Sequence, residues 1–214
     1  MRLPSGLMLE RPLNILLAFC GEEYDYYDAI PSRNPNDIEP IDVLVTISVN
    51  SFINNAKRVR QIHRDLASTC GRLLKQIPND ADILTFDPAF DSVERLLHTA
   101  VQSRNVLIPV ATKVLHRKRR FLIPMLDNVL IEYYLTAKGR RSVLPSTQDK
   151  RHAAKAARLV MADFRDDLEA VSGEIATLTG LLAQEGYSLS PIRILEILIW
   201  TSIEPTRHYR NISP

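Results

Sequence analysis

The stretch AAKAARLVMADFRDDLEAVSGEIATLTGLL, residues 153–182, carries the clearest structural pattern in the chain. Its apolar side chains recur at intervals of three and four residues, which is the spacing of one face of an α-helix. The pattern predicts a helix over 151–184, with the stripe alone roughly 45 Å long at 1.5 Å per residue. Such a helix either crosses the whole domain or forms the seam of a homodimer, and the sequence leaves both alternatives open. The stripe consists of Ala153, Ala157, Val160, Phe164, Leu168, Val171, Ile175, Leu178 and Leu182.

Helical patterns dominate the rest of the chain, and strand signals are scarce because no alternating run is bounded by hairpin turns. We therefore expect an all-α fold: one multi-helix domain over 1–205, followed by a flexible tail at 206–214. Besides the long helix, the pattern predicts helices over 12–28, 40–51, 57–77, 92–104, 107–118, 124–137 and 191–203.

Three local signals place helix starts. Ser190-Pro191 is typical of an N-cap followed by a first-turn proline, and Pro124 is suited to the first turn of another helix. Asp91 and Glu94 have the spacing of a capping box, in which the side chains at the N-cap and three residues later exchange hydrogen bonds with the backbone.

Composition restricts the class of protein. The chain has 214 residues, of which 45% are hydrophobic and 24% charged, an ordinary balance for a globular protein. No apolar run approaches the ~18 residues needed to span a membrane, and we expect neither a signal peptide nor a membrane partner. Two cysteines without a His/Cys cluster suggest neither a disulfide framework nor a zinc site, which points to the cytoplasm.

Motifs for metal or cofactor chemistry are not evident. The five histidines form no i, i+4 pair with an acid, and the seven glycines are too dispersed for a phosphate-binding loop. No serine or cysteine stands in a nucleophile motif. We expect no metal and no cofactor.

Positive charge gathers in the middle of the chain. Residues 101–160 hold thirteen basic and only three acidic side chains, a local charge of +10 in a chain of net charge +2. Four of the basic residues, Arg117 to Arg120, are consecutive. Clustered positive charge attracts polyanions, and the arginine fork matches phosphate oxygens. The alternative is that these residues spread over several helices as solvated faces.

Directly after this basic run stands FLIPMLDNVL, residues 121–130, with one carboxylate, Asp127. In a structural interpretation, Asp127 lies in the first turn of a helix, interacts with the helix dipole and accepts a backbone N–H. In a functional interpretation, apolar neighbours shield Asp127 from water and shift its pKa.

The segment VLIPVATKVLHRKRRFLIPMLDNVLIEYY, residues 106–134, resembles the core of the helix-hairpin-helix DNA glycosylase superfamily. The resemblance implies a helical hairpin, a short entry and a further helix, with Asp127 as the aspartate that activates water or stabilises the oxocarbenium ion. Lys113 stands near the place of the lysine that forms a Schiff base in the lyase members, with a shorter spacing to the aspartate. The family's hairpin glycines are missing, because the chain has no glycine between Gly71 and Gly139 and LIPV occupies the turn.

The chain is also similar to an uncharacterised bacterial domain family of unknown function. The resemblance rests on NSFINNAKRVRQIHRDLASTCGRLLKQIPNDADI (50–83), KVLHRKRRFLIPMLDNV (113–129) and SPIRILEILIW (190–200). It implies one coherent domain and carries no assigned activity.

Two functions follow as hypotheses. The first is a nucleic-acid-binding protein that uses its basic middle, 101–141, with base excision by Asp127, and Lys113 as a candidate Schiff-base lysine. The second is a non-catalytic protein-interaction or regulatory module, a homodimer through the helix 151–184. The basic side chains should share one face under the first hypothesis, and the apolar stripe should be exposed in the monomer under the second. The expected nucleic-acid-binding residues are Lys113, Arg117, Lys118, Arg119, Arg120, Lys138, Arg140 and Arg141.

Overall fold

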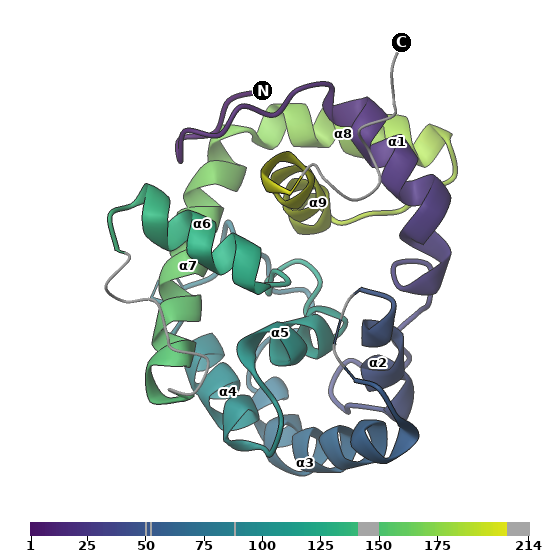
Figure 1. The fold of residues 1–214 in the computed structure, drawn as a ribbon, viewed down its shortest axis with the longest axis vertical. Helices are drawn as coiled ribbons and strands as arrows, with labels where there is room; N and C mark the ends of the chain where they lie inside the picture. The colour runs from purple at the N-terminus through teal and green to yellow at the C-terminus, as the bar shows by residue number, and fades with distance from the viewer. Residues whose placement is uncertain (50, 52, 88, 141–149, 205–214) are drawn as a thin grey trace.

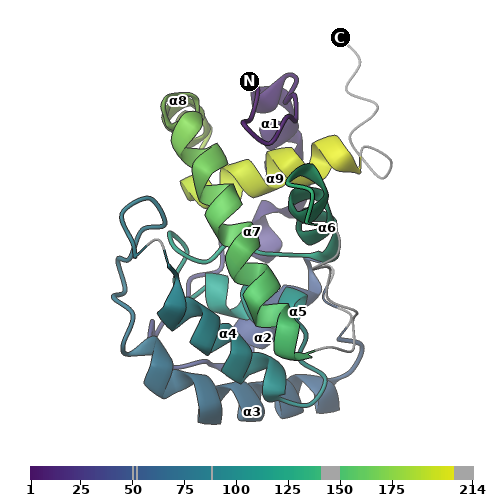
Figure 2. The same ribbon diagram turned by 90° about the vertical axis from the view of Figure 1, so that its left-hand side faces the viewer.

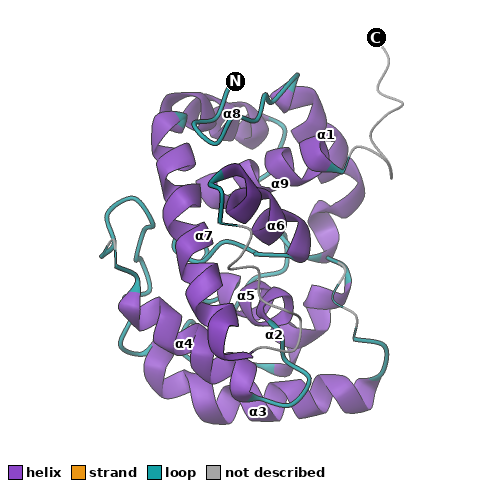
Figure 3. Ribbon diagram, turned by 60° about the vertical axis from the view of Figure 1, so that its left-hand side comes forward, coloured by secondary structure: helices purple, strands orange, loops and turns teal. Residues whose placement is uncertain are grey.

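The computed structural model describes residues 1–49, 51, 53–87, 89–140 and 150–204, and this part of the chain is built from helices without a sheet (Figures 1 and 3). The expected all-α fold is confirmed. The expected tail, 206–214, lies outside the described residues. The helices are α1 (Pro12–Glu23), α2 (Pro40–Leu44), α3 (Ala56–Leu74), α4 (Asp91–Gln102), α5 (Ile108–His116), α6 (Asn128–Ala137), α7 (Lys150–Ala170), α8 (Ser172–Gln184) and α9 (Pro191–Ile203), with short 3-10 turns η1 (Tyr24–Tyr26) and η2 (Val45–Ile47).

The helix α7 connects the two ends of the molecule. At one end it packs against α4, which lies on α3, and further along it contacts α5, α6 and α9 (Figure 2). Above it, α9 lies between α1, α6 and α8 (Figure 1). Nine residues of α9 are buried, which confirms the expectation of a buried helix, whereas its Trp200 is only partly buried against the core.

The apolar stripe of 153–182 faces inward, but the helix that carries it is not continuous. The helix α7 ends at Ala170, and α8 begins at Ser172 after a turn at Val171, where φ is −114° and ψ is 18°. The expected single helix over 151–184 is therefore corrected to two helices. Sharp bends in helices occur at Gly/Ser pairs, and Ser172-Gly173 directly follows the break. Because Val171 itself is buried, the stripe continues through the bend.

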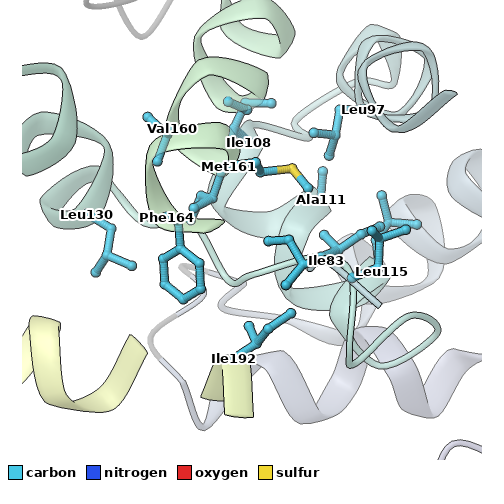
Figure 4. Close-up of a cluster of buried hydrophobic side chains, with 14 of the residues drawn as sticks. Ile83, Leu97, Ile108, Ala111, Leu115, Leu130, Val160, Met161, Phe164 and Ile192 are labelled. Carbon is cyan, nitrogen blue, oxygen red and sulfur yellow. The ribbon is translucent and has the colours of Figure 1, made fainter. Parts of the chain in front are cut away.

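Side chains of the stripe form the centre of the hydrophobic core. Val160, Met161 and Phe164 of α7 meet Leu97 of α4 and Ala111 of α5, and all five are fully buried (Figure 4). The chain's own helices thus cover the stripe, which is the domain-crossing alternative. A dimer seam along 151–184 would have left these side chains exposed in the monomer.

Two of the expected helix starts are corrected and one is confirmed. The residues from Pro124 to Asp127 are not helical, so α6 begins at Asn128 with Asp127 as its N-cap. The N-cap of α4 is Phe90, in the left-handed region with a φ of 52°, so Asp91 belongs to the first turn and makes no capping box. At α9, Ser190 Oγ accepts the N–H of Arg193 at 3.2 Å, and the cap followed by proline is as expected.

Candidate functional site

Three of the four residues of the basic run after α5, Arg117 to Arg119, turn into the protein instead of facing solvent. Arg117 Nε lies 3.0 Å from Asp42 Oδ1, and Lys118 Nζ lies 2.5 Å from Asp42 Oδ2. All three side chains are almost fully buried, at 3%, 0% and 0% exposure respectively. Asp42 also accepts the N–H of Glu39 at 2.8 Å, within a capping box at the start of α2. The pairs join the end of α5 to α2.

Arg119 is buried completely and donates along its whole guanidinium. Its Nε donates to Ile77 O at 3.1 Å, its Nη1 to Pro35 O at 2.7 Å, and its Nη2 to Asn36 Oδ1 at 2.9 Å. Nη2 also donates to Leu74 O, the last residue of α3. A cation at this point complements the negative end of the α3 dipole, so Arg119 joins the end of α3 to the segment 35–36.

The remaining expected nucleic-acid-binding residues do not share a surface with these three. Arg120 is exposed and donates to Ser188 O at 3.2 Å. Lys138 is exposed at the end of α6, and Arg140 pairs with Asp163 of α7 at 2.8 Å. Arg141 lies outside the described residues. The structure therefore binds Arg117, Lys118 and Arg119 into the fold and spreads the others over different elements.

Lys113 and Asp127, by contrast, are brought into one site. Lys113 lies in the last turns of α5 at 6% exposure, and its Nζ donates to Val49 O. Asp127 caps α6, where its Oδ1 accepts the N–H of Leu130 at 2.9 Å. The two side chains interact electrostatically, each favouring the charged form of the other. Asp127 thus fills the capping role of the structural interpretation, one turn from where Pro124 had suggested the helix start.

Burial shifts the pKa of both groups toward the neutral form. It lowers the pKa of the Lys113 amine to about 8, although Asp127 acts in the opposite direction. Burial also raises the pKa of the Asp127 carboxyl, against the N–H of Leu130 and the charge of Lys113. An amine and a carboxylate with pKa values moved toward each other are the features that mark acid–base and nucleophilic sites, and also buried structural pairs.

Three further charged residues, which the sequence patterns did not indicate, form a buried network next to this site. They are Arg193, Asp28 and Glu196. Arg193 of α9 pairs with Asp28 at 3.1 Å and with Glu196 at 3.4 Å, and its guanidinium stacks over the Phe19 and Tyr27 rings. Glu196 accepts the N–H of Met125, two residues before Asp127. Burial raises the pKa of Glu196 to about 7, against the attraction of Arg193.

Tyr27 connects Arg193 to Lys113. Its ring lies under the Arg193 guanidinium, and its hydroxyl donates to the Lys113 carbonyl at 2.6 Å. The signal for this network was present in PIRILEILIW, residues 191–200, where Arg193 and Glu196 are the only charges in an otherwise apolar helix. Charged side chains in a helix that is buried on most sides must pair with each other or with another element, because an isolated buried charge is strongly unfavourable.

The lowered pKa of Lys113 predicts a specific dependence of stability on pH. The folded pKa of about 8 lies below the ordinary value of 10.5, so the unfolded chain binds more protons between these values and stability rises with pH there. A Lys113→Met variant loses this contribution. The difference in unfolding free energy between wild type and variant should change in favour of wild type by about 1 kcal/mol per pH unit between pH 8 and 9.5. Urea titrations across this range measure it, and parallel curves would show an ordinary lysine.

No helix in the described residues is both long and apolar enough to cross a membrane. Cys20 and Cys70 are free and buried.

Comparisons with known proteins identify a family but no activity. A search of curated proteins gave no match, and a search of solved structures gave none either. The glycosylase resemblance thus gains no support from them and stays a prediction. A family model described as a family of unknown function (DUF6308) matches residues 15–203, which include every helix from α2 to α9 and most of α1. The expected membership of an uncharacterised family is therefore confirmed, and the chain belongs to DUF6308.

Proposed function

We propose that the protein binds nucleic acid and that Lys113 and Asp127 act on it as a reactive pair, in a reaction of the base-excision class. The observation that carries the proposal is that Lys113 of α5 and Asp127, the N-cap of α6, are close enough to interact electrostatically, with the amine pKa lowered to about 8. The order of elements supports it, because α4, a short turn, α5, a non-helical entry and α6 follow one another as the glycosylase resemblance implies.

One detail of the hairpin differs from the sequence expectation. Ile108 and Pro109 open α5 and are not part of the turn, which is formed by residues 103–107. In that turn Asn105 has a φ of 62°, a left-handed conformation that asparagine tolerates better than most residues. Asn105 therefore takes a backbone conformation that glycine adopts most easily, in a segment without glycine.

The chemistry open to Lys113 is attack on a carbonyl carbon. At pH 8 about half of an amine with this pKa is neutral and carries a free electron pair. With the ring-opened aldehyde of an abasic sugar, the nitrogen forms a bond to the carbon, the carbonyl oxygen leaves as water, and a Schiff base results. For this reaction the Nζ must release the carbonyl of Val49, to which it donates in the structure.

Asp127 has the position and the charge for the accompanying proton transfers. Asp127 is partly exposed at the N-terminus of α6, within electrostatic range of the amine. Because its pKa is raised, the carboxyl exchanges protons more readily near neutral pH than an exposed aspartate does. In the related reaction on an intact nucleoside, the ionised form stabilises a positively charged sugar.

Borohydride trapping tests the proposal directly. The full chain is incubated with a duplex that contains an abasic site, and reduction converts a Schiff base into a stable cross-link visible on a denaturing gel. We expect cross-linking by wild type to increase with pH through about pH 8, following deprotonation of Lys113. It should disappear in Lys113→Met and fall about 100-fold in rate in Asp127→Asn.

Lys155→Met is the matched control, because it removes an exposed lysine of α7 outside the pair. It should cross-link like wild type. Cross-linking that persists in Lys113→Met, or that is missing in wild type, would contradict the proposal and leave Lys113 with its structural bond to Val49.

A further inference from the structure

One side of α3 is a continuous line of basic side chains. At 100° per residue, Lys57, Arg60, Arg64, Arg72 and Lys75 (the residue that ends the helix) all fall within about 60° of a single direction. All five are exposed, while the opposite side of α3 is buried through Val59, Ile62, Leu66, Cys70 and Leu74. The line is about 27 Å long at 1.5 Å per residue, and α3 lies at the outer edge of the molecule (Figures 1 and 2).

These cations are not used by the fold in the way that Arg117 to Arg119 are. Among the described residues, none of the five takes part in a salt bridge with an acid. The only acid within α3 is Asp65, which accepts from Gln61 Nε2 at 2.9 Å and 3.0 Å. The neighbouring segment 34–38 adds one exposed carboxylate, Asp37. The line therefore keeps a clear excess of positive charge facing solvent.

We propose that this basic face of α3, defined by the five residues above, binds the phosphate backbone of nucleic acid. A regular line of charge about 27 Å long matches a polyanion with evenly spaced phosphates, and arginine and lysine are the side chains that make most backbone contacts. The hydroxyl of Ser68, exposed between Arg64 and Arg72 on the same side of the helix, is a further group that can contact the backbone.

The structure favours nucleic acid over a lipid surface. Helices that lie on membranes insert apolar side chains beside their cations. The apolar side chains of α3 are buried against the rest of the protein, so the basic face has none to insert. This surface goes beyond the reactive pair proposed above, and it needs no chemistry at Lys113 or Asp127.

Fluorescence anisotropy tests the basic face. Labelled duplex DNA of 20 base pairs, the matching RNA duplex, and single strands of each are titrated with the full chain from 50 to 200 mM salt. Five phosphate contacts predict a slope of log affinity against log salt of about −4 to −5 on duplex DNA. The double variant Arg60→Glu/Arg64→Glu should bind at least about tenfold more weakly, with a slope shallower by about 2.

Arg2→Glu/Lys155→Glu is the charge-matched control, because both residues are exposed and lie outside α3. It should bind within about threefold of wild type. The basic face is overturned if wild type fails to bind at 50 mM salt, if both double variants weaken equally, or if only anionic phosphatidylserine vesicles bind in a manner sensitive to Arg60 and Arg64. Loss of cross-linking in Lys113→Met with unchanged affinity would separate the reactive pair from the binding surface.

Discussion

Replacement of Asp42 by asparagine is expected to destabilise the protein by about 3–5 kcal/mol, a Tm decrease on the order of 10 °C for a chain of this size. Asp42 is fully buried and is the carboxylate partner of both Arg117 and Lys118. Asparagine keeps the shape but removes the charge, so two cations stay buried without a counter-ion. The cost of breaking such a network comes mainly from these uncompensated charges.

Asp163→Asn is the matched control for Asp42→Asn. Asp163 also pairs with an arginine, but the side chain of Arg140 is 36% exposed. Solvent screens this pair, and its loss should cost about 1 kcal/mol or less. Urea denaturation of both variants measures the difference. If Asp42→Asn were no less stable than Asp163→Asn, the buried cations would not depend on Asp42.

The inward direction of Arg117 to Arg119 could not be predicted from the run itself. Composition reports how many charges a segment has, but not which way each side chain points. The partner Asp42 lies 75 positions away from Arg117 along the chain, and the carbonyls bound by Arg119 include Leu74 at the end of α3, Ile77 just after it, and Pro35. A charge-reversal variant at Arg117 or Arg119 would therefore report first on folding and only then on nucleic-acid binding.

The helical stripe shows which structural information a periodic sequence does carry. Spacings of three and four residues identify the side of a helix that is buried, and the stripe side chains confirm this from Ala157 to Leu182, with Ala153 partly buried. The spacing of apolar residues does not reveal whether a helix is straight. A bend changes the direction of the helix axis, but the same side of the helix stays buried before and after it. The pair Ser172-Gly173 was the only local sign of the turn at Val171.

The basic face of α3 could not be predicted from the position of its residues in the sequence. Its five cations are spread over nineteen positions and are interspersed with other side chains, so the sequence alone does not show that they share one side of a helix. They become visible only when the apolar pattern of Val59, Ile62 and Leu66 fixes which side of the helix is inside. Asp127 could be predicted because a short apolar entry to a helix contains few polar residues, whereas Lys113 was indicated only by the resemblance to the glycosylase superfamily.

Replacement of Arg119 by methionine is expected to have the largest effect on stability, a loss of at least about 4 kcal/mol. Methionine has a similar length but donates no hydrogen bond. The change removes the guanidinium donors to the carbonyls of Pro35 and Ile77, and the Leu74 carbonyl keeps only the N–H of Ile77 at 3.1 Å. Hydrogen bonds to a charged group contribute about 1.5–3 kcal/mol each, and a typical domain is stable by only 5–15 kcal/mol. We therefore expect Arg119→Met to be largely unfolded near its ordinary working temperature.

The adjacent residue supplies the control, because Arg120 is exposed and donates only to Ser188 O. Arg120→Met should change the unfolding free energy by less than about 1 kcal/mol. Where Arg119→Met yields too little protein for a urea titration, Arg119→Lys keeps the charge while lacking the planar fork, and its stability should lie between wild type and the methionine variant. Equal stabilities of the Arg119 and Arg120 variants would mean that the end of α3 and the segment 35–36 hold together without the guanidinium. If Arg119→Met is much less stable than Arg120→Met, Arg119 is required to join α3 to the rest of the domain. The most basic stretch of the sequence then contributes to the stability of the fold.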